Sequence, residues 1–518
     1  MVRVLVVIVG TILLLGPALL NGGPFLYFDT VNYLSRPDKA IGLLARALDA
    51  DVPSIMAAAG PVNAASVGIA PPNMPPPGVE TGYIVGGRSV FYGLLVWIAA
   101  AIGHPGLLAA GQAAATVAVL WAIWSLLPPG ERARRDAAGF VLMIAALAVL
   151  TPAGFFAGLL MPDILAPLAI VAIALLVCAW TRLGRAARAG LAALLALALV
   201  SHNSHLLVGL CLVVAGAGLR LAVPDARQHL SLPGLGCCAG IAVLALGAVT
   251  AADVAAERLS GVDVISRPHL TAHLVDDGPG ALWVARNCGT DGAATLGGDE
   301  AAVCAFRDRI PSDWIAFLFS EAPEDGAFQA RDAAPDLRRA LSAQDLDFAL
   351  AVLRDDPVGT VRFLLGDAVR QLVWVGFDDV PLAGEALRSR AHLFPPGMAE
   401  GDGGRIAADP PLLSALSEAA AVGVAAGALA LLVGWSVLLA HPDRTPGHER
   451  LLWVVGAIVL GLLLNAAVCG ILASPHDRFQ ARVAFLLPVL AVAVWTALLR
   501  SFLSPRATEV PDLKRFAE

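Results

Sequence analysis

The chain has 518 residues, of which 58% are hydrophobic and 15% are charged, and its mean hydropathy is +0.74. A soluble globular domain usually carries about 25% charged residues, so this composition excludes an ordinary soluble enzyme. Disordered, collagen-like and disulfide-scaffold chains are excluded as well, because apolar residues are abundant and Pro, Gly and Cys do not dominate. The formal net charge of −7 excludes the simplest kind of nucleic-acid-binding protein.

Charge is unevenly distributed along the chain. The segment 254–412 carries 25 of the 42 acidic residues and 14 of the 35 basic residues, so its formal charge is −11 and that of the remainder is +4. This division predicts that 254–412 is a separate domain between two apolar modules, 1–253 and 413–518.

Ten stretches are apolar enough to cross a membrane as helices, which need about 20 mainly apolar residues. Their apolar runs are continuous rather than alternating, which favours helices over a membrane barrel. The predicted spans are 4–20, 107–127, 138–158, 162–181, 189–201, 205–222, 234–253, 416–440, 452–473 and 483–503. The sequence therefore predicts an all-α polytopic membrane protein, with spans 1–7 in the N-terminal module and spans 8–10 in the C-terminal module.

The first predicted span has two interpretations. Residues 4–20 follow a single basic residue, Arg3, as the apolar region of a signal peptide does. No convincing small-x-small cleavage site follows Leu20, and the apolar stretch is long enough to span. A retained anchor is therefore the favoured interpretation.

A shorter apolar segment, Ser89–Ile102, has about 14 residues and predicts a helix lying in the membrane interface, within a first exported loop of 22–106. If this segment does not cross, 15 basic residues of the termini and short connections share one side. Six basic residues then lie on the other side, outside 254–412. The positive-inside rule then predicts ten spans with both termini in the cytoplasm. We expect a bacterial inner-membrane protein whose active site and acidic domain face the periplasm.

Cysteine placement separates two roles. Five of the seven cysteines lie in apolar windows, where they are expected to act as small packing residues. Cys288 and Cys304 are the two cysteines of the exported segment, and an oxidising compartment predicts a disulfide between them. Two unpaired thiols are the alternative, and a zinc site is disfavoured because the chain has no CxxC pair.

The acidic segment is predicted to be mainly helical. Apolar residues at spacings of three and four predict helices over Leu337–Leu353 and Val358–Val375. The second of these is expected to lie on the membrane surface or against the bundle. An ordinary helix of a domain core is the alternative.

Ionisable residues are nearly absent inside the predicted spans and gather at their outer ends, whereas ion-coupled transporters usually keep such residues near the bilayer midplane. Arginine binds phosphate oxygens in a bidentate manner, and a carboxylate accepts a proton from an attacking hydroxyl. The outer-face set therefore predicts a site for a lipid phosphate. Its members are Asp29, Arg88, Asp163, His202, His205, His476, Asp477, Arg478 and Arg482.

Taken singly, each of these residues has a simpler structural role. Asp163 could be stabilised by a helix N-terminus, and Asp29 could cap a short helix. Arg478 and Arg482 could contact lipid headgroups, and the two histidines could be hydrogen-bonded turn residues. Their common position on one face of the membrane favours the functional interpretation.

Four motifs follow one another in a characteristic order. Asp29 and Tyr33 follow the first span, and Asp163 stands at the head of the fourth. Between them, Arg88-Ser89-Val90-Phe91-Tyr92 opens the interfacial helix, and Arg478-Phe479 with Leu486-Leu487-Pro488 comes late in the chain. This order resembles the GT-C superfamily of polyprenyl-phosphate-sugar glycosyltransferases, such as protein mannosyltransferases and the lipid A aminoarabinose transferase. The resemblance covers most of 1–222 and 413–503.

The chain departs from the family at two places. Ser201-His202-Asn203-Ser204-His205 stands where members often have a Lys- or Gly-rich turn, and a lone Asp29 stands where a paired Asp-Glu is common. The segment 254–412, with RPHLTAHLVDDGPG, matches no member, and it is expected to influence acceptor choice.

The resemblance implies an inverting transfer of a sugar from a polyprenyl phosphate to a lipid, glycan or protein acceptor. Asp29 would act as the general base on the acceptor hydroxyl. A divalent cation near Asp29, Asp163 and His202 is a further candidate, because some relatives use one and others do not. The residues implied to bind the donor phosphate are Arg88, His202, His205, Arg478 and Arg482, and those implied for an acceptor or metal site are Tyr33, Tyr92 and Asp163.

Two other functions remain open from the sequence. A membrane glycan polymerase or ligase acting on the same lipid typically has many spans and one large exported loop. A flippase or transporter of lipid-linked sugars would have polar residues along its spans and internal inverted repeats, neither of which is evident.

Overall fold

The computed structural model describes residues 2–48, 54–55, 82–127, 133–289, 294–399, 401–442 and 444–503. The chain is mainly helical, as predicted. The N-terminal part consists of α1 (Val2–Leu14), α2 (Gly16–Asn21), α3 (Phe28–Ala47), β1 (Tyr83–Val85), α4 (Val90–Ala101), α5 (Gly106–Trp124), α6 (Ala133–Leu150), α7 (Ala153–Gly158), η3 (Pro162–Ile164), α8 (Leu165–Cys178), η4 (Trp180–Arg182), α9 (Arg185–Ser201), α10 (Asn203–Ala222), α11 (Ala226–His229) and α12 (Leu232–Ser260).

Shorter elements make up the acidic segment. They are β2 (Asp263–Ile265), α13 (His269–Val275), α14 (Pro279–Asn287), β3 (Thr295–Leu296), β4 (Asp299–Glu300), η5 (Ala302–Arg309), α15 (Trp314–Phe319), α16 (Pro335–Ala343), α17 (Asp345–Asp355), α18 (Pro357–Val373), α19 (Gly384–Arg388) and η6 (Ala391–Leu393). The chain then continues through α20 (Pro410–Ala440), α21 (Pro446–Leu472), α22 (Asp477–Ala484) and α23 (Leu486–Leu503).

Among the described residues, six helical segments are long and apolar enough to cross a membrane, which makes the chain an all-α multi-pass membrane protein. They are α5, α10, α12, α20, α21 and the continuous stretch Asp477–Phe502 that joins α22 to α23. The other four predicted spans are shorter or broken. Proline explains two of the breaks: Pro17 follows the kink at Leu15, and Pro152 separates α6 from α7.

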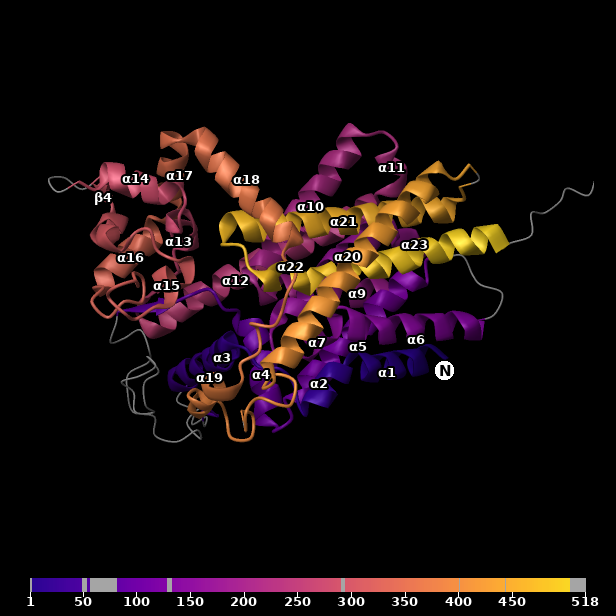
Figure 1. Ribbon diagram of the computed structural model, residues 1–518, viewed down its shortest axis with the longest axis horizontal. Helices are drawn as coiled ribbons and strands as arrows, with labels where there is room; N and C mark the ends of the chain where they lie inside the picture. Colours follow the sequence, from indigo (N-terminus) through magenta and orange to yellow (C-terminus); the bar gives the residue numbers. More distant parts are fainter. Residues whose placement is uncertain are drawn as a thin grey trace, which may run out of the picture.

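The segments that connect the helices lie at two opposite ends of the molecule, as Figure 1 shows. The N-terminus, α11 and the end of α23 lie towards one end. Helices α3, α4 and α19 lie towards the other end, with the cluster α13–α17 beside them. The cluster α13–α17 of the acidic segment therefore lies away from the N-terminus and from the end of α23.

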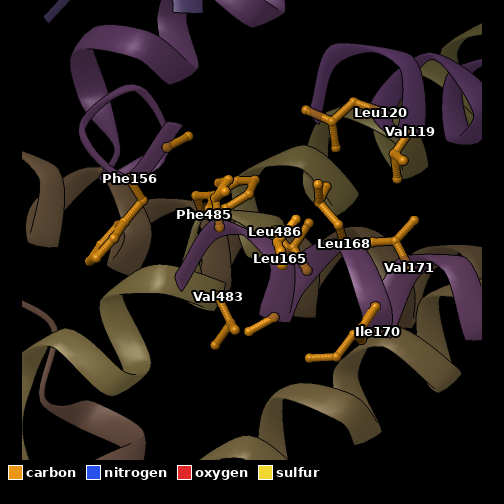
Figure 2. Close-up of a cluster of buried hydrophobic side chains, with 14 of the residues drawn as sticks. Val119, Leu120, Phe156, Leu165, Leu168, Ile170, Val171, Val483, Phe485 and Leu486 are labelled. Atoms are coloured by element: carbon orange, nitrogen blue, oxygen red, sulfur yellow. The ribbon is translucent and has the colours of Figure 1, made fainter. Parts of the chain in front are cut away.

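Helix α8 is the centre of the N-terminal bundle. Every residue from Leu165 to Cys178 is buried, and the helix contacts α5, α9, α10, α12, α21 and α22. Figure 2 shows Leu165, Leu168 and Val171 among side chains from other elements, including Phe485 and Leu486. Because its side chains are apolar all around, α8 has no polar face to present to water or to lipid headgroups.

The acidic segment has a second apolar core of its own. A disulfide joins Cys288 to Cys304 beside this core, with a Cα–Cα distance of 5.2 Å. The helix predicted over Leu337–Leu353 is two helices, because Gln344 ends α16 and turns its side chain to Ala302 N and Glu300 O.

Helix α18 packs along α21 with its polar side inwards. Thr360, Asp367 and Gln371 are buried, whereas apolar residues on the opposite side are exposed. The prediction that this helix lies against the bundle is therefore right. The alternative, a helix of the domain core, holds for Phe363 and Leu364, which pack against the second apolar core.

Candidate functional site

A short parallel pairing brings two carboxylates of the predicted site to the same region. Phe25 pairs with Leu159: Phe25 N donates to Gly158 O, and Leu160 N donates to Phe25 O, both at 2.9 Å. Asp29 follows Phe25 by four residues, and Asp163 follows Leu159 by four. Because both chains run in the same direction, the two aspartates leave the pairing at the same end.

A second parallel pairing does the same for two arginines. Strands β1 and β2 pair in parallel with Val85 opposite Ile265. Arg88 lies three residues beyond the first strand, and Arg267 lies two residues beyond the second. The segment before α4 and the acidic segment therefore each place one arginine at the same end of this sheet.

Both carboxylate oxygens of Asp29 accept hydrogen bonds from protein side chains. Arg88 donates to its Oδ2 at 2.6 Å, and Asn32 donates to its Oδ1 at 3.1 Å. Burial raises the pKa of Asp29, but Arg88 and Arg478 oppose this effect, and the net pKa is lowered. Asp29 is therefore ionised at neutral pH, and Arg88 is its principal counter-ion.

Asp163 lies in η3, almost fully buried, between two arginines of α22. Its Oδ1 is 3.5 Å from Nε of Arg478 and 3.5 Å from Nη1 of Arg482. The turn that carries Asp163 is held by Gln112, whose side-chain amide donates to Leu159 O at 2.9 Å. Asp163 thus pairs with both arginines of α22 from a fixed position.

Arg482 makes more hydrogen bonds to protein partners than Arg478 does, although its buried Nε has no hydrogen-bond partner among the described residues. It is 1% exposed, and its Nη2 donates to Ser204 Oγ and Asn465 Oδ1, both at 3.1 Å. Asn465 in turn donates to Phe479 O at 2.7 Å and so holds α22 against α21. Arg482 is therefore placed to fix the geometry of the site.

Arg478 differs from Arg482 because much of its hydrogen-bonding capacity is unused. Its Nε and Nη1 are buried and have no hydrogen-bond partner among the described residues. Its guanidinium lies 4.3 Å from the ring centre of Tyr27 and 5.3 Å from that of Phe479. An arginine held between two rings with free N–H groups is prepared to bind an anion.

The two histidines of the predicted site lie on the break between α9 and α10. Nδ1 of His202 accepts from Ser204 N at 3.2 Å, so the proton of a neutral His202 is on Nε2. Nδ1 of His205 is 3.1 Å from Ala198 O, and its buried Nε2 has no hydrogen-bond partner within the described ranges. The histidine rings are 5.2 Å apart, and Ser204 links this turn to Arg482.

The predicted tyrosines have different surroundings. Tyr92 donates to Gln112 Oε1 at 2.7 Å and packs edge-on against Tyr33 at 5.1 Å. The buried hydroxyl of Tyr33 has no hydrogen-bond partner in the part of the chain that the structure describes. Tyr92 therefore joins α4 to α5, whereas Tyr33 retains a free hydroxyl beside α4.

Sequence reasoning missed Arg267 and His269. Burial and then Arg88 lower the pKa of Arg267 to about 10, and Asp29 opposes them. Burial, followed by Arg88 and Arg267, lowers the pKa of His269 to about 4. Both residues belong to the RPHL motif, and the strand-like Asp-Val-Ile before it was the available signal.

The other residues that sequence reasoning missed contact the site residues and hold them in position. Tyr27 stacks under Arg478, while Ser204 and Asn465 fix Arg482. Ser89 Oγ donates to Val200 O at 2.6 Å and caps α4, so it connects the Arg88 segment to the end of α9. Arg36 donates to the carbonyls of Val85 and Arg88 and fixes the turn between β1 and α4.

A metal centre receives no support from this geometry. Within the described ranges, no group of three or more His, Cys, Asp or Glu side chains could hold a metal ion. Asp29, Asp163 and His202 do not gather into a ligand set there, and both carboxylates have arginine partners instead.

Comparison with known proteins identified no relative of this chain. No family model, no curated protein and no solved structure matches this chain.

Proposed function

We propose that this protein is an integral membrane glycosyltransferase that transfers a sugar from a polyprenyl phosphate to a lipid, glycan or protein acceptor, with inversion. One observation carries the proposal: four buried or half-buried arginines, Arg88, Arg267, Arg478 and Arg482, share the site with two aspartates. Uncompensated buried charge is costly, so such a site gains stability from an anionic ligand. A phosphate matches the unused guanidinium N–H groups.

The proposed step uses these residues in separate roles. The acceptor hydroxyl oxygen attacks the anomeric carbon while the bond from that carbon to the phosphate oxygen breaks. Asp29 takes the hydroxyl proton, and the lipid phosphate leaves with the electron pair of the broken bond. Arg478 and Arg267 stabilise the charge that develops on the phosphate, and Arg482 keeps α22 in position.

Asp29 can accept the proton only when Arg88 moves away from its Oδ2. We propose that the incoming phosphate draws Arg88 to itself, which frees the carboxylate when the donor is bound. This exchange couples donor binding to activation of the base.

The membrane placement belongs to the same proposal. The four shorter or broken helical segments complete ten spans, and α4 lies in the membrane interface. The protein resides in a bacterial inner membrane with Asp29, Arg88 and the acidic domain facing the periplasm. A donor then enters sideways from the outer leaflet, between α4 and the bundle.

Binding of undecaprenyl phosphate to the full-length protein in nanodiscs tests the proposal, with undecaprenol as the ligand that lacks the phosphate. We expect saturable binding of the phosphate and at least about tenfold weaker binding of the alcohol. Arg478→Gln and Arg267→Gln should each weaken phosphate binding about tenfold or more. Arg286→Gln, at a 54% exposed side chain on α14, is the matched control. Equal affinity for both lipids would overturn the proposal.

A further inference from the structure

A second cavity lies at the end of the bundle opposite to the candidate site. Its volume is about 590 Å³, within the range of about 300–1,000 Å³ typical of ligand sites. Residues of α8, α10, α11, α12, α20 and α21 line it, and none of the predicted site residues does. Figure 1 places α11 towards the end that carries the N-terminus, away from α3 and α4.

The wall of this cavity changes from apolar to ionic along its length. The apolar part includes Ile173, Val177, Leu212 and Leu460, all on helices of the bundle. The ionic part is formed where helices end, by Asp225, Gln228, His229, Arg444 and Glu449. An amphiphile matches such a gradient, since its chain would lie among the apolar helices and its headgroup would lie at their ends.

Two residues that line the cavity are exposed on apolar helices. They are Leu219 of α10 and Leu439 of α20, which are 39% and 50% exposed. Both helices are apolar enough to cross a membrane, so these side chains face hydrocarbon. A lipid could therefore enter from the bilayer.

Aromatic residues indicate the depth in the membrane at which the ionic part of the cavity lies. The His229 ring stacks on Trp453 at 5.3 Å, and Trp435 also lines the cavity. Tryptophan is enriched at the boundary between hydrocarbon and headgroups. The ionic residues therefore lie at the depth where a phospholipid headgroup would be.

The charged residues in the ionic part of the cavity determine which kind of headgroup it can bind. Arg444 offers a cation for a phosphate, and Glu449 and Asp225 offer carboxylates. Among the described residues, Arg444 and Glu449 have no ion-pair partner, and Asp225 has His229 at 3.8 Å. A headgroup with a phosphate and an ammonium group would satisfy both signs, whereas a purely anionic one would leave the carboxylates uncompensated.

We infer that this cavity binds a zwitterionic phospholipid with a primary ammonium headgroup. One chain and the headgroup occupy the cavity, and the rest of the lipid remains in the bilayer. Arg444 binds the phosphate, Glu449 and Asp225 bind the ammonium group, and Trp453 lies beneath the headgroup. This site is separate from the proposed transferase site and does not depend on it.

Native mass spectrometry of the full-length protein, purified in mild detergent, tests the inference. Phosphatidylethanolamine and phosphatidylglycerol are added back separately. We expect one bound phosphatidylethanolamine, with at least about tenfold preference over phosphatidylglycerol. Ala457→Trp, which places a large side chain in the cavity, should lower occupancy about tenfold. Glu449→Gln should abolish most of the preference while leaving phospholipid binding in place.

Two controls keep the result interpretable. Ala426→Trp changes an exposed position of α20 that does not line the cavity and should bind like the wild type. Ala215→Trp fills the cavity from α10 and should repeat the effect of Ala457→Trp if that variant is unstable. Equal retention of both phospholipids, a polyprenyl lipid in the cavity, or undiminished binding in both filled variants would overturn the inference.

Discussion

Arg88 donates a 2.6 Å hydrogen bond to Asp29, so the carboxylate predicted as the base is bound to an arginine predicted to bind phosphate. Two separate parts of the chain meet in this pair, the start of α3 and the turn between β1 and α4. Arg36 fixes the second part by donating to the carbonyls of Val85 and Arg88. The pair is therefore a fixed feature of the site, and its opening is the conformational step that the mechanism requires.

Asp29→Asn separates the role of base from that of counter-ion. We expect the transfer rate to fall by about 10²–10⁴-fold, because the variant has no carboxylate to accept the proton. Binding of undecaprenyl phosphate should remain as tight or become tighter, because removing a negative charge makes the site more cationic. The rate is followed through surface glycans and lipid A by mass spectrometry, and the affinity in nanodiscs.

The control for this change is Asp336→Asn, at a 93% exposed side chain of α16. It should alter neither property. If Asp29→Asn cells kept wild-type glycans at normal protein levels, with the product detectable in wild-type cells, Asp29 would not be the base. Weaker phosphate binding in the same variant would show that Asp29 orders Arg88 for the ligand.

Arg482 and Arg478 should respond differently to substitution although they lie four residues apart. Arg482→Met removes the donor to Ser204 and Asn465 and leaves buried Asp163 with a weaker cationic environment. We expect unfolding free energy to fall by about 3–5 kcal/mol. Arg478→Met should cost less, because Nε and Nη1 make no hydrogen bond, yet it should weaken phosphate binding.

Thermal unfolding in detergent measures the first effect, and undecaprenyl phosphate titration measures the second. Adding Asp163→Asn to Arg482→Met should recover part of the lost stability, because it removes the carboxylate that the arginine compensated. Equal destabilisation by the two arginine variants would contradict this assignment of roles.

His269 should make the stability of the protein sensitive to acid. Burial, followed by Arg88 and Arg267, lowers the pKa of His269 to about 4, below the value of about 6.5 expected in the unfolded chain. Between these values the unfolded state binds the proton and the folded state does not. Unfolding free energy should therefore fall by about 1 kcal/mol for each pH unit below about 6.5, until the folded histidine also titrates near pH 4.

The measurement is the melting temperature of the full-length protein between pH 7 and pH 4.5. His269→Gln should flatten the upper part of this profile. His104→Gln, at an exposed histidine between α4 and α5, should not. A profile for His269→Gln as steep as that of the wild type would contradict the prediction.

Local patterns in the sequence predicted the helices and the outer-face residues, but not how those residues are brought together. The Phe25–Leu159 and β1–β2 pairings join segments more than 100 residues apart, and neither is long enough to leave a strand pattern. Arg267 was missed for this reason, since only the register with β1 places it near Arg88. Helix breaks at Leu15 and Thr151 arise from the neighbouring Pro17 and Pro152. Both prolines lie inside apolar windows, and the average hydropathy of such a window does not reveal a break.

Helix α18 shows a second limit of prediction from sequence. Its periodicity identified a helix but did not reveal which face of the helix points towards the bundle. Polar Asp367 is turned inwards, where its Oδ2 is 2.9 Å from Nε2 of His273 and its Oδ1 is 3.0 Å from Arg370. Gln371 donates to His476 O and accepts from His476 N. His273 comes from α13 and His476 from the start of α22, and the sequence of α18 alone reveals neither.

The outward apolar stripe of α18 should contact lipid. Its members follow at spacings of three and four and are 37–79% exposed: Val358, Val361, Leu365, Val369 and Leu372. Helix α18 packs along α21, a helix apolar enough to span, so the stripe continues an apolar surface of the bundle. We expect a nitroxide attached at Leu365→Cys to collide more with oxygen, which concentrates in hydrocarbon, than with a water-soluble nickel complex.

The spin-label experiment uses a background in which Cys211 and Cys237 are serine, because these free thiols are not buried. The same label at Asp336→Cys on α16 should show the opposite preference, since that side chain is exposed on the acidic domain. Preferential collision of the Leu365 label with the nickel complex would place α18 in water. Its apolar stripe would then be a surface for a protein partner, and α18 would not lie at the depth of the hydrocarbon.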